Sequence, residues 1–367
     1  GGGGGEGRVD GDVLASMVGT GDRPMFYATN RHDPNMPGAG SDDEGEEGSE
    51  AGDLEFRPDD VVLLAGRHEE DADVLEVWVY EEAGEDGEEA NLYVHHDLLL
   101  SAFPLSLAWL DLRPGQGPGS RGNLVCVGTM EPEIEVWDLD VLDAAAPAAV
   151  LGGDAAAGGP PTRKKAKKGD RARAEERGGH SGAVLGLAWN PSFRHVVASG
   201  SADKTVRVWD VSEGRCDTVL GGHEGKVQAV AWNAQEPSVL LSGAFDKTCR
   251  VCDVRSPGGG EGLSWGVGSD VESLAWSPHE QHVFAASTED GRVQAADCRK
   301  AGEVMWELNA HGKAASGLCF HPAARGVMAT CSVDKTVRLW HSEGGKRPAK
   351  PLHTEDLKSG ALFALGF

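Results

Sequence analysis

The sequence predicts an all-β fold made of repeated sheets, and two observations carry this prediction. The first is a period of 43 or 44 residues that three sets of residues keep through four units. The sets are Trp189, Trp232, Trp276 and Phe320; Asp203, Asp246, Asp290 and Asp334; and Trp209, Cys252, Ala296 and Trp340. The second is that each unit contains short β-branched-rich runs between turn residues such as Asn190-Pro191 and Glu213-Gly214. A lone sheet of this kind cannot bury both faces, so neighbouring units must stack around an axis, as in a β-propeller.

One unit shows the expected strands most clearly. Its strand-like runs are Ala183–Trp189, Val196–Ser199, Thr205–Val211 and Cys216–Leu220. Runs of this length are typical of strands, so we expect one antiparallel sheet of four strands per unit.

Two looser units precede the periodic ones. The nearer unit has strand-like runs at Leu105–Trp109, Leu124–Gly128 and Ile134–Asp138. The earlier unit, around Trp78, has runs at Val61–Ala65, Val74–Tyr80 and Leu92–His95.

The charge of the chain is strongly acidic and unevenly distributed. The 367 residues include 34 basic and 59 acidic side chains, which gives a formal net charge of −25. Such a charge repels phosphate at long range and argues against a general nucleic-acid-binding surface. Acidic residues gather in a run spaced by Gly and Ser: Asp42, Asp43, Glu44, Glu46, Glu47 and Glu50. We expect residues 1–52 to be a disordered Gly-rich and acidic tail, and residues 53–367 to be the propeller.

Residues 142–178 are expected to be a low-complexity loop inserted between two units. The segment is rich in Ala, Gly and Pro and then turns basic. Its basic residues are Arg163, Lys164, Lys165, Lys167, Lys168, Arg171, Arg173 and Arg177. Loops of this length are usually functional or linkers. Three interpretations stay open: a nuclear-import signal, a sequence-independent contact with RNA phosphates, and a merely solvated loop.

The residue pattern gives no indication of catalysis, a cofactor, a metal or a membrane segment. No Gly-rich phosphate loop lies between a strand and a helix, no G-x-S-x-G turn occurs, and histidines recur at the repeat period. Cys249 and Cys252 have C-x-x-C spacing, but no further pair of ligands lies nearby, and residues three apart on a strand point to opposite faces. No run of ~18 apolar residues is present. Seven scattered cysteines indicate a reducing compartment.

The periodic units resemble WD40 repeats. The resemblance rests on Gly179-His180 with residues 201–210 (SADKTVRVWD), Gly222-His223 with Asp246-Lys247-Thr248, and His311 with residues 334–340 (DKTVRLW). It implies a buried hydrogen-bonded set of His, Ser or Thr, Asp and Trp in each blade. The members in this chain are His180, Ser199, Asp203, Trp209, His223, Ser242, Asp246, His311, Thr330, Asp334, Trp340 and Trp137. Cys252 and Ala296 replace Trp, and Ser269 or Asp270 replaces one His, so two blades are expected to be held less tightly.

The repeat also suggests how many blades the ring has. Six third strands can be counted, at Trp78, Trp137, Trp209, Cys252, Ala296 and Trp340. His353 to Phe367 starts a further unit with one strand-like run, Ala361–Leu365. Because seven blades are common in this family, we expect a seven-bladed propeller whose last blade is incomplete in this chain. Residues near Met25–Ala28 are the alternative source of closure.

A narrower resemblance points to one group of WD40 proteins. Residues 91–106 (NLYVHHDLLLSAFPLS) and 127–140 (VGTMEPEIEVWDLD) are not repeat elements, and both resemble the periodic tryptophan protein 1 family. The Lys-rich insert and residues 242–247 (SGAFDK) match it too. The resemblance implies a non-catalytic scaffold in the nucleus and nucleolus. Such a scaffold would bind ribosome-assembly proteins and precursor large-subunit particles and assist ribosomal RNA maturation, with RNA contact through the basic loop, and would take no small-molecule substrate.

Two further sets of residues suggest contacts with partners. Lys204, Lys247 and Lys335 each follow the turn Asp of their unit and should share one face of the propeller, although Asp-Lys-Thr is also ordinary turn chemistry. Arg255 and Arg299 resemble the WDxR pattern of cullin ubiquitin-ligase substrate receptors, without its Trp. An adaptor that binds chromatin, histones or a cullin ligase is therefore the alternative function.

Overall fold

The computed structural model describes residues 56, 60–68, 72–82, 90–112, 121–153, 178–256, 262–342, 349–358 and 360–366. The chain divides into two compact units, Gly1–Asp59 and Asp60–Phe367, and every strand below belongs to the second. The predicted tail at residues 1–52 and the closing segment Met25–Ala28 lie outside the described residues.

Within the described residues there are 23 strands, no helix, and six antiparallel sheets, which we call blades 1 to 6 in chain order. Blade 1 has three strands: β1 (Val61–His68), β2 (Asp73–Glu81) and β3 (Asn91–Leu99). Blade 2 has β4 (Pro104–Leu112), β5 (Arg121–Thr129), β6 (Ile134–Asp138) and β7 (Ala149–Leu151). Blade 3 has β8 (Val184–Trp189), β9 (Val196–Ser201), β10 (Val206–Asp210) and β11 (Arg215–Leu220).

The remaining blades repeat the four-stranded pattern. Blade 4 has β12 (Val227–Trp232), β13 (Val239–Ala244), β14 (Thr248–Asp253) and β15 (Leu263–Gly266). Blade 5 has β16 (Val271–Trp276), β17 (Val283–Thr288), β18 (Arg292–Asp297) and β19 (Val304–Asn309). Blade 6 has β20 (Gly317–Phe320), β21 (Val327–Cys331), β22 (Thr336–His341) and β23 (Lys350–Asp356).

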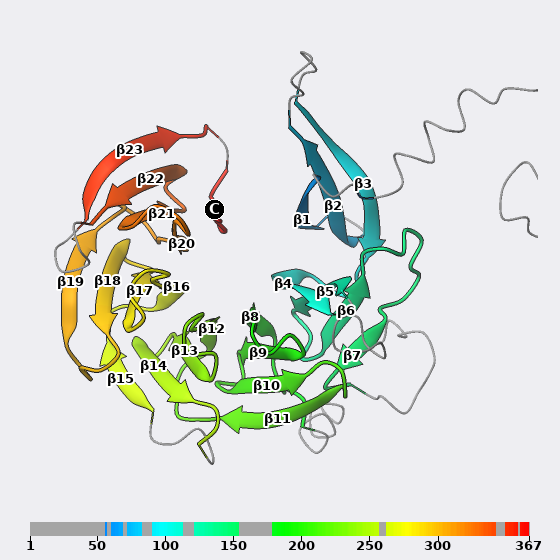
Figure 1. Cartoon of the computed structure of the whole chain (residues 1–367), viewed down its shortest axis with the longest axis horizontal. Helices are drawn as coiled ribbons and strands as arrows, with labels where there is room; N and C mark the ends of the chain where they lie inside the picture. Colours follow the sequence, from blue (N-terminus) through cyan, green and yellow to red (C-terminus); the bar gives the residue numbers. More distant parts are fainter. Residues whose placement is uncertain are drawn as a thin grey trace, which may run out of the picture. The chain divides into compact units, whose positions relative to one another are not determined.

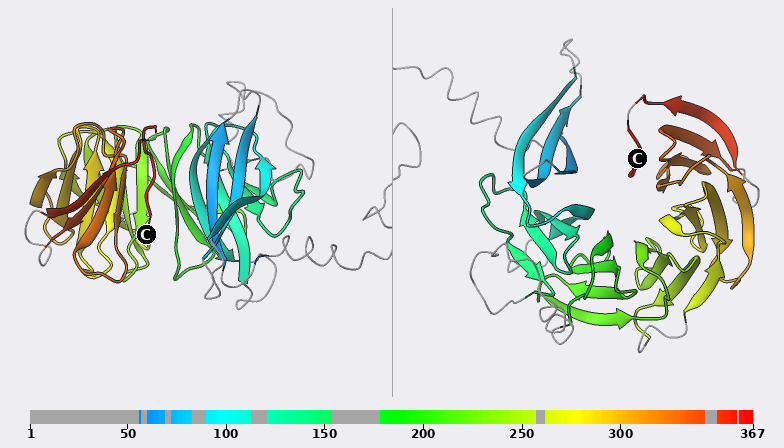
Figure 2. Two further views of the ribbon diagram at one scale, coloured as in Figure 1. Left: turned by 90° about the horizontal axis from the view of Figure 1, so that it is seen from above. Right: turned by 180° about the vertical axis from the view of Figure 1, so that it is seen from behind.

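Successive blades pack through their first strands, β4 against β8, β8 against β12, β12 against β16 and β16 against β20. Figure 1 shows these strands on the inside of the arc of blades and β11, β15, β19 and β23 on the outside. The same order is visible from behind in Figure 2. This arrangement is a β-propeller, as the repeat predicted.

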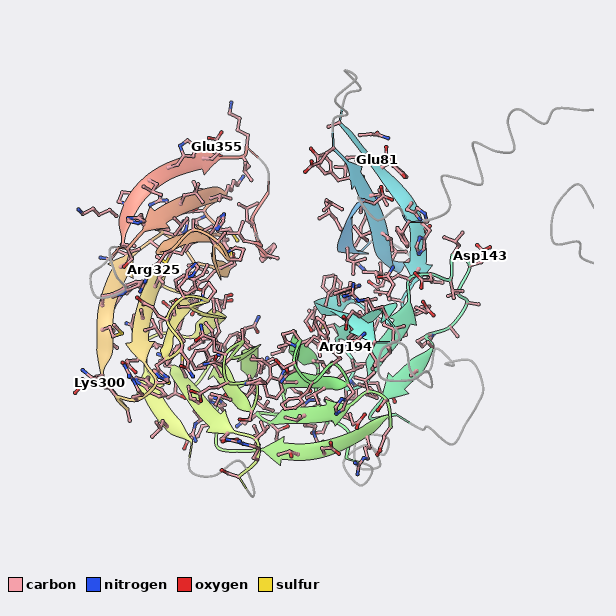
Figure 3. All side chains as sticks on the ribbon, viewed as in Figure 1. Glu81, Asp143, Arg194, Lys300, Arg325 and Glu355 are labelled. Carbon is pink, nitrogen blue, oxygen red and sulfur yellow. The ribbon has the colours of Figure 1, made fainter. Side chains whose placement is uncertain are left out.

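The hydrophobic core lies between blades rather than inside any one of them. On β10, Val206 and Val208 pack in the cluster shared with blade 4, whereas Trp209 and, just after the strand, Val211 pack in the cluster shared with blade 2. Neighbouring residues of a strand point to opposite faces, so both faces of a blade need a neighbour. Side chains accordingly fill the spaces between the sheets in Figure 3. A single blade would expose the apolar residues of both faces to water.

Two expectations about element boundaries are wrong. The predicted inserted loop at 142–178 contains β7, which is the fourth strand of blade 2 and hydrogen-bonds to β6. The apolar run Ala149-Val150-Leu151 is short and follows an Ala-rich stretch, so its edge-strand role depends on β6 being beside it. The rest of the insert, residues 154–177, lies outside the described residues.

The C-terminal residues also differ from expectation. His353 lies in β23, the outer strand of blade 6, and does not start a new blade. Residues 361–366 form no strand. Instead, the N–H of Leu362 donates to the Ser332 carbonyl at 3.3 Å, and Ser316 Oγ donates to the Leu362 carbonyl. The described residues thus supply six blades, and the seven-bladed ring stays a prediction.

Candidate functional site

A buried polar network joins the strands of blade 3. His180 Nδ1 is 2.9 Å from Asp203 Oδ2, and its Nε2 is 2.6 Å from Ser199 Oγ. Trp209 Nε1 donates to the same Ser199 oxygen at 2.8 Å. His180 and Ser199 are fully buried, so these groups can satisfy only one another.

Asp203 also fixes the turn between β9 and β10. Its carboxylate accepts hydrogen bonds from the Ser181 N–H at 3.0 Å, the Thr205 N–H at 2.9 Å and the Thr205 hydroxyl at 2.7 Å. One side chain therefore ties the segment before β8 to the start of β10.

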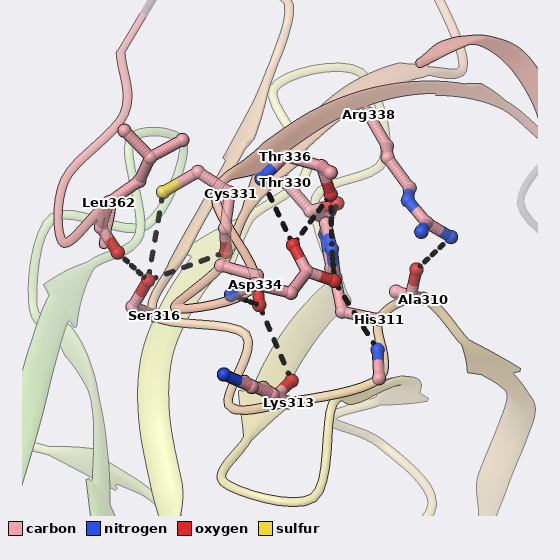
Figure 4. A network of polar contacts seen from close by, with 12 residues as sticks. Ala310, His311, Lys313, Ser316, Thr330, Cys331, Asp334, Thr336, Arg338 and Leu362 are labelled. Atoms are coloured by element: carbon pink, nitrogen blue, oxygen red, sulfur yellow. Dashed lines mark hydrogen bonds and ion pairs between the residues drawn. The ribbon is translucent and has the colours of Figure 1, made fainter. Parts of the chain in front are cut away.

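Blades 4 and 6 repeat the network. In blade 4, His223 Nδ1 is 2.9 Å from Asp246 Oδ2, and His223 Nε2 is 2.9 Å from Ser242 Oγ. In blade 6, Figure 4 shows the corresponding residues His311, Asp334 and Thr330. The N–H of Trp340 donates to the Thr330 hydroxyl at 2.9 Å. The structure thus brings together the histidine, hydroxyl and aspartate predicted in all three blades, and the tryptophan in blades 3 and 6.

The protonation states follow from burial and hydrogen bonding. Burial lowers the pKa of His180, His223 and His311, which keeps these imidazoles neutral at pH 7. Burial alone would raise the pKa of Asp203, but the hydrogen bonds from His180, Thr205 and Ser181 lower it well below its usual range. A carboxylate only accepts, so His180 Nδ1 carries the proton and the Ser199 hydroxyl donates to Nε2.

This set of groups has the composition of a Ser-His-Asp triad, but its geometry is structural. The Ser199 hydroxyl is fully buried and already accepts the Trp209 N–H. No substrate atom can approach it without opening the blade. A triad nucleophile must instead face a cleft.

In blades 1 and 2, a glutamate carboxylate accepts the hydrogen bond from the tryptophan N–H. Trp137 Nε1 donates to Glu135 Oε2 at 2.9 Å, and Trp78 Nε1 donates to Glu76 Oε2 at 3.0 Å. Val127, opposite Glu135, takes the position that Ser199 has in blade 3. Sequence reasoning placed Trp137 in the polar set but missed these glutamates, although Glu-Val-Trp occurs in both blades.

Blade 5 has neither the hydroxyl nor the tryptophan. Ala286 and Ala296 occupy the two positions and are buried in the cluster between blades 4 and 5. Aromatic packing replaces the polar network: Phe284 contacts Trp265 at a centroid distance of 5.2 Å and Trp276 at 5.6 Å. Blade 5 therefore fills the space around these two positions with aromatic rings, while Gln294 remains a buried polar side chain that donates to the Val267 carbonyl.

The turns between second and third strands share one end of the blades, which we call the turn face. Lys204, Lys247 and Lys335 lie there in the left-handed region, with φ of 71°, 65° and 75°, and blade 5 has Gly291 with φ of 83°. All three lysines are exposed, and no ion pair between described residues includes their ammonium groups. Among the described residues, these three lysines thus place positive charges without ion pairs on the turn face.

The remaining candidate residues divide into three groups. The basic residues 163–177 lie outside the described residues. Arg255 and Arg299 are exposed, and each guanidinium pairs with the aspartate two residues earlier, at 2.6 Å to Asp253 and 2.6 Å to Asp297.

Cys249 and Cys252 pack in different clusters, on opposite faces of β14, as their spacing on a strand predicted. Burial raises the pKa of the Cys249 thiol to about 12. Among the described residues, no three His, Cys, Asp or Glu side chains are grouped closely enough to hold a metal ion. The same part of the chain contains no helix that could span a membrane.

Comparison with known proteins adds family relationships to this geometry. The WD domain, G-beta repeat family matches at residues 175–210, 214–253, 266–295 and 302–341, which are blades 3 to 6. The periodic tryptophan protein 1 homolog of Drosophila melanogaster is 34% identical over 319 residues, 86% of this chain and 64% of that protein. Periodic tryptophan protein 1 of Saccharomyces cerevisiae is 31% identical over 91% of this chain and 62% of its own length.

An uncharacterized WD repeat-containing protein of Schizosaccharomyces pombe is 44% identical over 86% of this chain and 58% of its own length. The chain therefore spans less than two thirds of each of these relatives. The matches confirm both resemblances expected from the sequence.

Proposed function

We propose that this chain, which has WD40 repeats and resembles the periodic tryptophan protein 1 proteins over most of its length, is a scaffold in ribosome biogenesis. The scaffold is non-catalytic. Its partners are ribosome-assembly proteins and precursor large-subunit particles, and its place is the nucleus and nucleolus. The observation that carries the proposal is that the His, hydroxyl and Asp groups that could form a catalytic set in blades 3, 4 and 6 are hydrogen-bonded to one another inside the fold. The surface then serves binding rather than chemistry.

The turn face is the surface we assign to docking. Lys204, Lys247 and Lys335 project from equivalent turns of blades 3, 4 and 6 and are free of ion pairs among the described residues. Ammonium groups spaced by rigid sheets fit phosphates of a folded RNA or carboxylates of a partner protein.

The basic insert adds a second contact with RNA. Residues 163–177 hold eight basic and three acidic side chains. If about five of these charges each neutralise a phosphate, the logarithm of the binding constant falls with the logarithm of salt concentration with a slope of about −4. The same residues can act as a nuclear-import signal.

Co-sedimentation with precursor large-subunit particles tests the proposal. A variant without residues 163–177 carries a grafted import signal and should sediment less with the particles, with the largest deficit at low salt and a shallower salt dependence than the unaltered chain. The triple change of Lys204, Lys247 and Lys335 to Gln should also weaken sedimentation. Lys300→Gln is the matched control, because Lys300 is exposed but lies in a turn at the opposite end of blade 5.

Two outcomes would contradict the proposal. Unchanged sedimentation of the deletion variant at every salt concentration would remove the RNA role of the insert. A pull-down enriched in histones or a cullin adaptor, with no ribosomal RNA, would favour the adaptor function instead.

A further inference from the structure

Asparagine side chains clasp successive blades at the face opposite the turn face. Asn190, after β8, donates from Nδ2 to the Pro237 carbonyl of blade 4 at 2.7 Å. Its Oδ1 accepts the N–H groups of Ser192 at 3.1 Å and Phe193 at 3.0 Å. One carboxamide thus closes its own turn and holds the next blade.

The junction between blades 4 and 5 uses the same device. Asn233 Nδ2 donates to the Gln281 carbonyl at 2.8 Å, and Asn233 Oδ1 accepts the N–H groups of Gln235 and Glu236 at 2.9 Å and 3.1 Å. At both junctions the side chain donates to a carbonyl of the next blade and accepts two N–H groups of its own turn. A primary amide suits this site, because it donates through its nitrogen and accepts through its oxygen.

The junction between blades 5 and 6 lacks this carboxamide. Ser277 occupies the position, and the backbone of its turn is unchanged, since Ser277 N–H donates to the Val283 carbonyl at 2.9 Å as Asn190 N–H does to Val196 at 3.0 Å. The Ser277 hydroxyl makes no hydrogen bond to any described residue. Arg325 lies 48 residues after Ser277. Asn233 and Gln281, which are hydrogen-bonded to each other, have the same separation. The Arg325 carbonyl is therefore the counterpart of the Gln281 acceptor.

A pocket lies at this junction. Ser277 and Arg325 line it, together with the apolar side chains of Val283, Phe320 and Val327. Figure 3 labels Arg325 beside blades 5 and 6. The cavity volume is about 30 Å³, room for about two water-sized groups. That is the size of the end of one side chain.

The turn of blade 5 at the pocket corresponds to the turn that Asn233 closes in blade 4. His279 and Glu280 stand at the positions of Gln235 and Glu236, whose N–H groups donate to Asn233 Oδ1, and both line the pocket. Glu280 and Arg325 also line the pocket, and their charged groups are 3.5 Å apart. Because these opposite charges offset each other, the pocket favours a neutral ligand.

We propose that this pocket binds the side-chain carboxamide of a glutamine from a partner protein, in the place that Asn190 and Asn233 fill at the junctions of blades 3 and 4 and of blades 4 and 5. The methylene groups of glutamine lie along Val283 and Phe320, its Nε2 donates to the Arg325 carbonyl, and its Oε1 accepts the N–H groups of His279 and Glu280. The site goes beyond the proposed scaffold function, because it names the chemistry by which one face selects a protein segment.

NMR titration of the ¹⁵N-labelled full chain tests the site with three probes of similar size. N-acetyl-glutamine methylamide should shift the backbone amides of His279, Glu280 and Gly326. The glutamate and norleucine analogues should bind about tenfold more weakly, as expected for the loss of neutral hydrogen bonds. Equal shifts from the norleucine analogue, or no shift from any probe, would overturn the proposal.

Two variants at one position give the matched control. Ser277→Asn supplies the amide from the chain itself and should abolish the shifts caused by the glutamine probe. Ser277→Ala leaves the pocket open and should preserve them. If Ser277→Asn binds the probe as well as the unaltered chain does, the glutamine does not occupy the asparagine place and the proposal fails. Retention of the remaining amide spectrum shows that each variant is folded.

Discussion

Blades 3 and 5 form the same four-stranded sheet with opposite interiors. Blade 3 surrounds Trp209 with a hydrogen-bonded imidazole, hydroxyl and carboxylate. Blade 5 has alanines at the hydroxyl and tryptophan positions and fills the space with aromatic contacts to Phe284. Blades 1 and 2 take a third course and pair tryptophan with glutamate. The comparison teaches that the sheet requires a filled and satisfied interior, not one particular set of residues.

The largest loss of stability is expected when the buried tryptophan of blade 3 is replaced. Trp209→Ala should lower the free energy of unfolding by about 3–5 kcal/mol, since it removes a buried indole and leaves a cavity. Denaturant unfolding measures this loss. Melting no earlier than the unaltered chain would show that Trp209 is not a core residue.

The second largest difference in stability between blades 3 and 5 is expected when the turn aspartate is removed. Asp203→Ala should lower the free energy of unfolding by about 1–3 kcal/mol, because His180 and the Ser181 N–H lose their acceptor. The matched change in blade 5, Asp290→Ala, should cost about 1 kcal/mol or less, because the Thr288 hydroxyl that Asp290 accepts can still donate to the Arg292 carbonyl and the ion pair with Arg292 is exposed. Equal losses would mean that the network adds nothing to the turn.

Acid should weaken the network blades before blade 5. Hydrogen bonds to the carboxylates outweigh burial and lower the pKa of Asp246 and Asp334 to about 2 from 3.8, and burial lowers the pKa of the partner histidines from 6.5. A pKa that is lower in the folded state contributes stability above the unfolded value, and this is lost as pH falls.

Stability of blades 4 and 6 should therefore begin to fall below pH 6.5 and fall most between about 4 and 2. The hydrogen bond from Arg299 also lowers the pKa of Asp297 in blade 5 to about 2, so the blades should differ most between pH 6.5 and about 4. Hydrogen exchange at β13 and β21, measured against β17, follows the blades separately. An equal loss of protection at β17 in that pH range would contradict the assignment.

The smallest effect is expected at the turn lysines. Lys335→Gly should change the free energy of unfolding by less than about 1 kcal/mol, because glycine relieves the left-handed backbone but loses more entropy on folding. Gly291 already occupies the corresponding place in blade 5. A loss well above this, seen in thermal unfolding, would show that the lysine side chain holds the turn and is not free for a partner.

Much of the fold could be predicted because the repeat reports on packing directly. The Trp and Asp markers at one period placed blades 3 to 6 and the turns at Lys204 and Lys247. The acceptors of the buried tryptophans were harder to identify: Glu135 accepts the Trp137 N–H in blade 2, where Val127 stands at the position that carries a hydroxyl in blades 3, 4 and 6. Likewise, β7 is a strand only beside β6, and His353 joins blade 6 because β22 offers an open edge.

The sequence alone determined the all-β class, the period, the WD40 resemblance and the residues of the buried networks, because each depends on local pattern repeated along one chain. The tertiary structure decided which acceptor each tryptophan finds, that aromatic packing takes the place of the buried network in blade 5, and that the junction between blades 5 and 6 lacks the carboxamide of the two junctions before it. Those features depend on which side chains of neighbouring sheets face each other, and no single strand carries that information.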